Sequence, residues 1–142
     1  MCAGKNKAER VRNLIENAVL FLFGGVSYGL MELIWRGWTH WTMVIAGGCV
    51  FLLMQQINRR LLPHIHYIAA CVVSGLAVTA VELVFGLAVN VWLGWNVWDY
   101  SHLPLNLFGQ VSLPFTAIWT LLSVVALTLE RQVRFRMFGD IR

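Results

Sequence analysis

Two glutamates, Glu32 and Glu82, stand inside otherwise apolar stretches of this chain. An ionisable side chain in such surroundings is costly, so each marks a candidate site for a proton or a cation. No basic residue lies three or four positions from Glu82, so its partner must come from elsewhere in the fold or its carboxyl must be protonated. Helical steps from Glu82 trace one stripe of small and polar residues, and we expect this stripe to face another helix or a water-filled path. The stripe comprises Cys71, Gly75, Thr79, Glu82, Gly86 and Asn90.

Glu32 lies on a similar stripe with Gly25, Tyr28 and Gly29, and Arg36 follows it by four residues. That spacing places the two charged side chains on neighbouring turns of one helix face. A structural ion pair and participation in a site are therefore both open for Glu32.

Six of the seven tryptophans fall in two copies of W-x-G-W-x-x-W, at residues 35–41 and 92–98. Tryptophan is enriched at membrane interfaces, where its ring is apolar and its N–H is hydrated. Anchoring at an interface explains most of this pattern, and the glycine before the central tryptophan indicates a defined turn. The alternative is that these aromatic turns line or gate a site.

Two amides, Asn106 and Gln110, precede Pro114 within an apolar run. A proline inside a helix leaves the carbonyl four residues earlier without its donor, which here is the carbonyl of Gln110. Broken helices in transporters build ion or substrate sites from such groups. An ordinary kink is the other interpretation.

The elements that must position these residues are four runs of about 20 apolar residues, the length that crosses a bilayer. The chain has 142 residues, of which 58% are hydrophobic and 13% charged. The runs lack the alternation of barrel strands, so we predict an all-α integral membrane protein with four transmembrane helices. They cover about 14–35, 38–57, 66–93 and 106–129 of a transmembrane domain (14–130), between an N-terminal segment (1–13) and a basic tail along the inner leaflet (131–142).

The basic residues predict how the chain is oriented. Of its eleven lysines and arginines, only Arg36 falls on the side opposite to the termini. We therefore expect a multi-pass protein of the cell (inner or plasma) membrane with both termini cytoplasmic. The net charge of +4 is then a topology signal and an attraction to anionic lipid, and no nucleic-acid partner is expected.

Each hairpin of two spans contains one tryptophan motif, which favours two parallel two-helix repeats. The segments "MELIW" (31–35) and "VELVF" (81–85) also resemble each other. However, the glutamates and the tryptophans give different offsets between the two units, so chance similarity is a serious rival.

The stretch "GWNVWDYSHLPLNLFGQVSLPFTAIW" (94–119) resembles the small bacterial membrane family called "putative ABC-transporter type IV". The stretch "RGWTHWTMVIAGGCVFLLMQQIN" (36–58) resembles the first hairpin of that family. The resemblance implies the membrane topology and membership of a transport system, without a catalytic role to transfer. The residues that match its signature are Trp98, Asp99, Tyr100, Ser101, Pro104, Asn106, Gly109 and Gln110.

We predict a small transporter or channel for a cationic or proton-coupled solute, working in the bilayer as a homo-oligomer (a dimer). Glu82 would be the central site, Glu32 an outer partner, and the amides would line the path. The alternative is a non-transporting accessory or scaffold subunit of a larger membrane complex. An enzyme acting on lipid is a distant third, since no nucleophile–base pair is evident, and we expect no enzyme activity, cofactor or metal ion. The candidate binding residues are Glu32, Arg36, Trp38, Glu82, Trp95, Trp98, Asp99, Tyr100, Asn106 and Gln110.

Overall fold

The computed structural model describes residues 2–139, and four of its helices are long and apolar enough to cross a membrane. This confirms the predicted all-helical, multi-pass architecture. Two of these helices end in a π-helical segment, and a short hairpin precedes the last helix. In order, the elements are α1 (Cys2–Arg36), α2 (Trp41–Gln56), η1 (Ile57–Leu61), α3 (Tyr67–Gly86), η2 (Leu87–Trp92), β1 (Asn106–Leu107), β2 (Val111–Ser112) and α4 (Leu113–Phe138).

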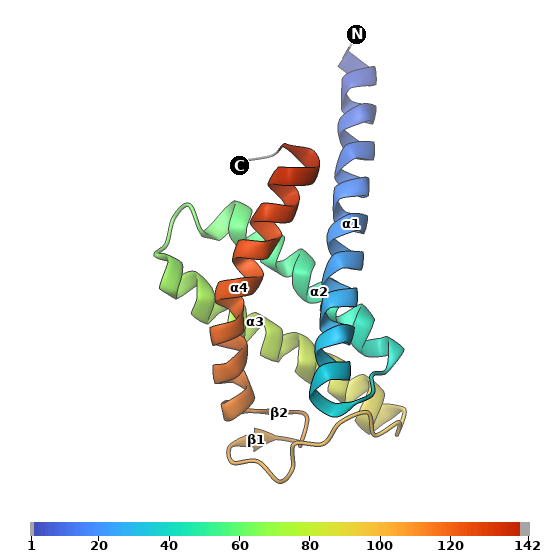
Figure 1. Cartoon of the computed structure of the whole chain (residues 1–142), viewed down its shortest axis with the longest axis vertical. Coiled ribbons are helices and arrows are strands. Elements are labelled where there is room, and N and C mark those ends of the chain that lie inside the picture. The colour runs from blue at the N-terminus through green and yellow to red at the C-terminus, as the bar shows by residue number, and fades with distance from the viewer. Residues whose placement is uncertain (1, 140–142) are drawn as a thin grey trace.

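Figure 1 shows α1 and α4 upright, with α2 and α3 running obliquely. Helix α1 begins and helix α4 ends in the upper half of this view, which we call the terminal end. The 37–40 turn and the 93–112 loop lie at the opposite end, which we call the loop end. The side of the membrane that each end faces stays a prediction.

The two tryptophan motifs fold into the turns that the sequence indicated. Gly37 follows α1 with a φ of 78°, and Gly94 follows η2 with a φ of 67°. Such left-handed conformations are easy only for glycine. The defined turn is thus confirmed, whereas the duplication of the two hairpins stays a prediction.

Small residues let the helices of each hairpin approach closely. The polar stripe of α3 faces α4, as expected: Gly75 packs against Thr120, and the hydroxyl of Thr79 lies 2.9 Å from that of Thr116. The main core fills the space between α2, α3 and α4 with side chains such as Met54, Val78, Trp119 and Leu127.

The fourth helix begins at Leu113, seven residues later than the predicted 106, and it is not broken at Pro114. Proline fits the first turn of a helix, where its missing N–H needs no partner. The expectation of an unbonded Gln110 carbonyl is wrong, because that carbonyl accepts a hydrogen bond of 2.9 Å from Trp98 Nε1.

Helix α4 extends into the predicted basic tail (131–142), and the position of that tail along the inner leaflet stays a prediction. α4 continues to Phe138 and ends at Gly139 in the left-handed conformation, and Arg134 on this last part is buried. Asn58 of η1 contacts this part of α4, because it donates hydrogen bonds to the Leu127 carbonyl and to Glu130. Residues 140–142 of the predicted tail, and Met1 of the predicted N-terminal segment, lie outside the described residues.

Candidate functional site

A cavity of about 360 Å³ lies at the loop end, between α1, α4 and the 93–112 loop. Half of the residues that line it are aromatic, and the rings of Tyr100 and Phe115 stack with their centroids 4.4 Å apart. Cavities of this kind, apolar with a few polar groups, are the usual form of small-molecule sites. The residues that matter most for its chemistry are Tyr28, Glu32, Arg36, Trp98, Tyr100 and Trp119.

Glu82 lies behind the cavity wall and is only 4% exposed. Its carboxylate accepts hydrogen bonds from Tyr28 Oη at 3.5 Å and from Trp119 Nε1 at 2.8 Å. These donors come from α1 and α4, which confirms that the partners of Glu82 come from elsewhere in the fold. Both donors are neutral, and both line the cavity, where their rings stack at 5.7 Å. Only the neutral side chains of Tyr28 and Trp119 therefore lie between the Glu82 carboxylate and the cavity.

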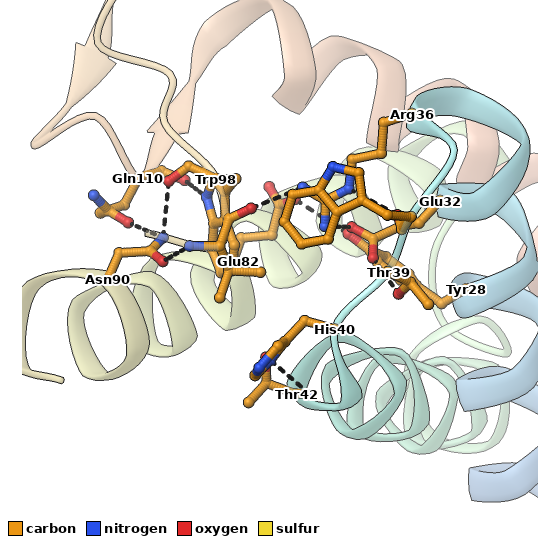
Figure 2. A network of polar contacts seen from close by, with 12 residues as sticks. Tyr28, Glu32, Arg36, Thr39, His40, Thr42, Glu82, Asn90, Trp98 and Gln110 are labelled. Carbon is orange, nitrogen blue, oxygen red and sulfur yellow. Dashed lines mark hydrogen bonds and ion pairs between the residues drawn. The ribbon is translucent and has the colours of Figure 1, made fainter. Parts of the chain in front are cut away.

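The predicted ion pair on α1 is present. Arg36 Nη2 lies 2.7 Å from Glu32 Oε1, and the hydroxyl of Thr39 donates to the other oxygen at 2.5 Å (Figure 2). Arg36 also donates to the carbonyl of Val97 at 2.9 Å and lies over the ring of Trp38, 4.1 Å from its centroid. This arginine thus clamps the 93–112 loop to α1, while the pair lines the cavity. The structural role of Glu32 is confirmed, and its binding role stays a prediction.

Gln110 serves the loop. Its side-chain oxygen accepts from Asn90 Nδ2 at 2.8 Å, and its side-chain nitrogen donates to the Phe108 carbonyl at 3.0 Å. Asn90, in the π-helical segment η2, also accepts from the Val97 amide at 2.7 Å and donates to the Trp98 carbonyl at 3.0 Å. Figure 2 shows this second network beside Glu82. The side chain of Gln110 thus holds the loop together, and its predicted role in lining a substrate or ion path stays a prediction.

Asp99 and Asn106 shape the loop from its exposed surface. The Asp99 carboxylate accepts from the Ser101 amide at 2.8 Å and from the Ser101 hydroxyl at 2.9 Å. Asn106 donates to the Leu103 carbonyl at 2.8 Å and accepts from the Gly109 amide at 3.1 Å. A Cβ at residue 109, where φ is +68°, would lie 2.9 Å from Asp99 Oδ1. These contacts explain the family signature as loop structure.

The tyrosine of the same signature faces inward. The amide of Tyr100 donates to the Gly109 carbonyl at 2.7 Å, and its side chain lines the cavity. Burial raises the pKa of the Tyr100 hydroxyl well above its ordinary value, and the nearby charge of Glu82 raises it further. The phenol therefore stays neutral and can serve the cavity only as a hydrogen-bonding and aromatic group.

Hydrogen bonds from the amide and then the hydroxyl of Ser101 lower the pKa of the exposed Asp99 carboxyl. Aspartate in an unfolded chain titrates near about 3.9. Ionised Asp99 thus stabilises the loop above that pH, and this contribution is lost as the pH falls through the lower folded value. We expect Ser101→Ala, which removes only the hydroxyl, to raise the pKa of Asp99 in an NMR titration. Thr128→Val, on the part of α4 near the terminal end, is the control; an equal pKa in all three proteins would contradict the assignment.

Trp38 and Trp95 lie outside the cavity. Trp38 covers Arg36, and Trp95 packs against His40 and Trp41, with ring centroids 5.4 and 5.8 Å apart. Both are about half exposed at the loop end, as expected of interfacial anchors. The structure thus brings Glu32, Arg36, Trp98 and Tyr100 to the cavity with Glu82 behind them, and leaves Trp38, Trp95, Asp99, Asn106 and Gln110 outside it.

Tyr28 and Trp119 were not among the predicted site residues, although they hold Glu82. Tyr28 could have been found, because it lies one turn before Glu32 on the polar stripe of α1. Trp119 is the one tryptophan outside the two motifs, and this isolated position in the sequence could have indicated a role in the site. Within the part of the chain that the structure describes, no group of three His, Cys, Asp or Glu is arranged to hold a metal ion.

A second set of buried charges lies toward the terminal end. Glu16, 1% exposed, accepts from Arg59 at 2.6 Å and from Gln55 at 2.9 Å. Glu130, fully buried, pairs with Arg134 at 3.0 Å and accepts from Asn58. Since Asn58 and Arg59 both belong to η1, this π-helical segment ties α1 and α4 to α2.

The comparisons with known proteins agree with the resemblance noted in the sequence. The family model described as "Putative ABC-transporter type IV" matches residues 21–141, which include α2, α3, α4 and the C-terminal part of α1. No solved structure matches the chain. The match covers far more than half of the sequence, so this multi-pass membrane protein belongs to the family described as "Putative ABC-transporter type IV".

Proposed function

We propose that the protein is a small membrane transporter or channel that binds a cationic or proton-coupled solute in the loop-end cavity. The observation that supports this most directly is the surroundings of Glu82. A carboxylate that is 4% exposed and hydrogen-bonded by neutral Tyr28 and Trp119 is expensive to keep in a membrane helix for structure alone. Such a group takes up a proton or attracts a cation, and both are functions of transport proteins.

The charges around the cavity favour a cation. Arg36 balances Glu32 within one turn, so Glu82 supplies the excess negative charge. The rings of Trp98, Tyr100 and Trp119 add the attraction of aromatic faces for cations. The amides Asn106 and Gln110 have no part in this binding proposal, because their contacts hold the loop.

The remaining predicted features belong to the same proposal. Both termini face the cytoplasm across the cell membrane, and two copies of the chain work together. The cavity at the loop end of a single chain, beside α1 and α4, is partly open, and a second copy would complete a path. No catalytic step is assigned to the protein.

Flux through purified protein in liposomes tests the proposal. Proton entry is followed with entrapped pyranine under a potassium–valinomycin potential, with and without external tetramethylammonium. We expect Glu82→Gln to lower the flux at least tenfold, because the amide keeps the shape but cannot ionise. Glu9→Gln, an exposed position on α1, is the matched control. Undiminished flux in Glu82→Gln would refute the proposed role.

One observation favours the alternative of an accessory subunit. His40, Trp41 and Trp95 form a partly exposed aromatic cluster beside the hydrogen-bonded loop, and together they present a preformed surface at the loop end. In that case a larger membrane protein would co-purify with the chain through this cluster, and Trp41→Ala with Trp95→Ala would release it. The protein alone would then show no flux.

A further inference from the structure

A second cavity adjoins the first on its side toward the terminal end. It measures about 170 Å³ and shares four lining residues with the larger cavity: Tyr28, Met31, Trp119 and Leu122. Beyond these, its walls come from α1 and α4, and its floor from α2 and α3, with side chains such as Phe51, Met54 and Val78. The two cavities therefore follow one another along the space between α1 and α4.

The two cavities differ sharply in chemistry. All the residues that line the second cavity are uncharged, and of its two serines Ser123 donates to the Trp119 carbonyl at 2.8 Å. The first cavity contains the Glu32–Arg36 pair and ends on the donors of Glu82. A charged group fits the first cavity and an apolar chain fits the second.

From this arrangement we propose that the transported solute is an amphipathic cation with an apolar tail. Its cationic head lies among Trp98, Tyr100 and Trp119 near Glu82, and its tail lies between α1 and α4 against Ala126 and Phe51. The inference rests on the proposed function and specifies its substrate class. A small hydrophilic cation would leave the second cavity empty. An uncharged apolar molecule would leave the negative charge of Glu82 without a positive charge near it.

The location of the cavities also indicates the route. Their outer walls include partly exposed residues of α4, such as Leu122, Val125 and Leu129, that would face the acyl chains in a bilayer. A tail already dissolved in the membrane can move sideways into the space between the two helices. The head then reaches the aromatic walls without crossing the apolar interior alone.

Binding of a chain-length series tests this inference. The probes are tetramethylammonium, butyltrimethylammonium and hexyltrimethylammonium, followed by tryptophan fluorescence of the protein in nanodiscs, with empty nanodiscs to correct for partitioning. Affinity referred to the free aqueous concentration should rise about fourfold for each methylene that enters the second cavity. Hexanol, with the same tail and no charge, should bind at least tenfold more weakly than hexyltrimethylammonium.

Two variants separate the head from the tail. Ala126→Phe fills the second cavity. It should lower the affinity for hexyltrimethylammonium to that for tetramethylammonium, and the affinity for tetramethylammonium itself should not change. Ala117→Phe, an exposed position on the same helix, is the matched control and should keep the full series. If Ala126→Phe does not yield folded protein, Leu129→Trp at the same cavity replaces it. Glu82→Gln should weaken all three cations at least tenfold.

The outcomes distinguish the two proposals. If affinity does not depend on chain length, or if it survives both cavity-filling variants, the amphipathic substrate is overturned, while loss of tetramethylammonium binding in Glu82→Gln still supports the proposed function. If Glu82→Gln binds tetramethylammonium as the wild type does, the proposed function fails. Equal binding of hexanol overturns the cationic head.

Discussion

Replacing Arg134 with methionine is expected to lower the free energy of unfolding by about 3–5 kcal/mol, the usual effect of removing one partner of a buried ion pair. Glu130 is fully buried, and Arg134 Nε lies 3.0 Å from its carboxylate. Methionine fills a similar volume but leaves a buried negative charge without this guanidinium. Denaturant unfolding in detergent micelles, followed by circular dichroism, measures the change.

Two comparisons make this expectation specific. Arg131→Met removes an exposed arginine three residues earlier on the same helix and should change the stability little. Replacing both Glu130 and Arg134 with leucine removes the charges together, and such replacements are often neutral or stabilising. Equal losses in Arg131→Met and Arg134→Met would show that the buried pair has no special role.

The pair of Glu130 and Arg134 shows which properties of basic residues the sequence can predict: their side of the membrane, but not their burial. Arg131, Arg134 and Arg136 were assigned together to a tail at the membrane surface, because their number indicates a cytoplasmic segment. Their charge says nothing about which of them a neighbouring helix covers. Only the folded structure distinguishes Arg134, which is buried and paired with Glu130, from the two exposed arginines.

Hydropathy predicted the four helices because a bilayer imposes their length and internal hydrogen bonding. The Glu32–Arg36 pair was predictable for a similar reason, since both residues lie on one helix. The start of α4 was not, because Pro114 is compatible with a kink in a helix as well as with its first turn. Asn106 and Gln110 were consequently placed in a membrane path, although they stabilise a loop.

Of the candidate site, the sequence could predict the central residue, Glu82, but not the residues that surround it. Glu82 is conspicuous in the sequence because charge is rare inside apolar runs. Its donors Tyr28 and Trp119 lie 54 and 37 residues away along the chain, and no spacing rule connects them to it. The apolar second cavity leaves no mark in the sequence at all, because its lining residues are ordinary for membrane helices.

The second large effect on stability is expected where α1 and α2 come closest. A Cβ added to Gly24 would clash with the Cβ of Phe51 and would lie 2.8 Å from the carbonyl oxygen of Gly47. The backbone carbonyl cannot move without its helix, so Gly24→Ala must push the helices apart. Overpacking of this kind typically costs about 1–3 kcal/mol, against about 1 kcal/mol gained in helix propensity.

Gly29 provides the matched control on the same helix and against the same partner. A Cβ there would meet only a methyl group of Val44, at 3.3 Å. Gly29→Ala should therefore leave the stability unchanged or raise it slightly, in the same denaturant experiment. If both alanine variants unfold alike, close packing at Gly24 does not limit the stability of the hairpin.

A double variant tests whether the contact is mutual. A Cβ on Gly47 would lie 2.9 Å from the Gly24 carbonyl, so both glycines serve one approach of the two backbones. Once Gly24→Ala has separated the helices, Gly47→Ala should cost less than it does alone, because contacting residues are not additive. Since α1 also forms one wall of both cavities, the same separation should weaken binding of hexyltrimethylammonium in Gly24→Ala while Gly29→Ala binds it normally. Losses that simply add would indicate that the two glycines act at independent contacts.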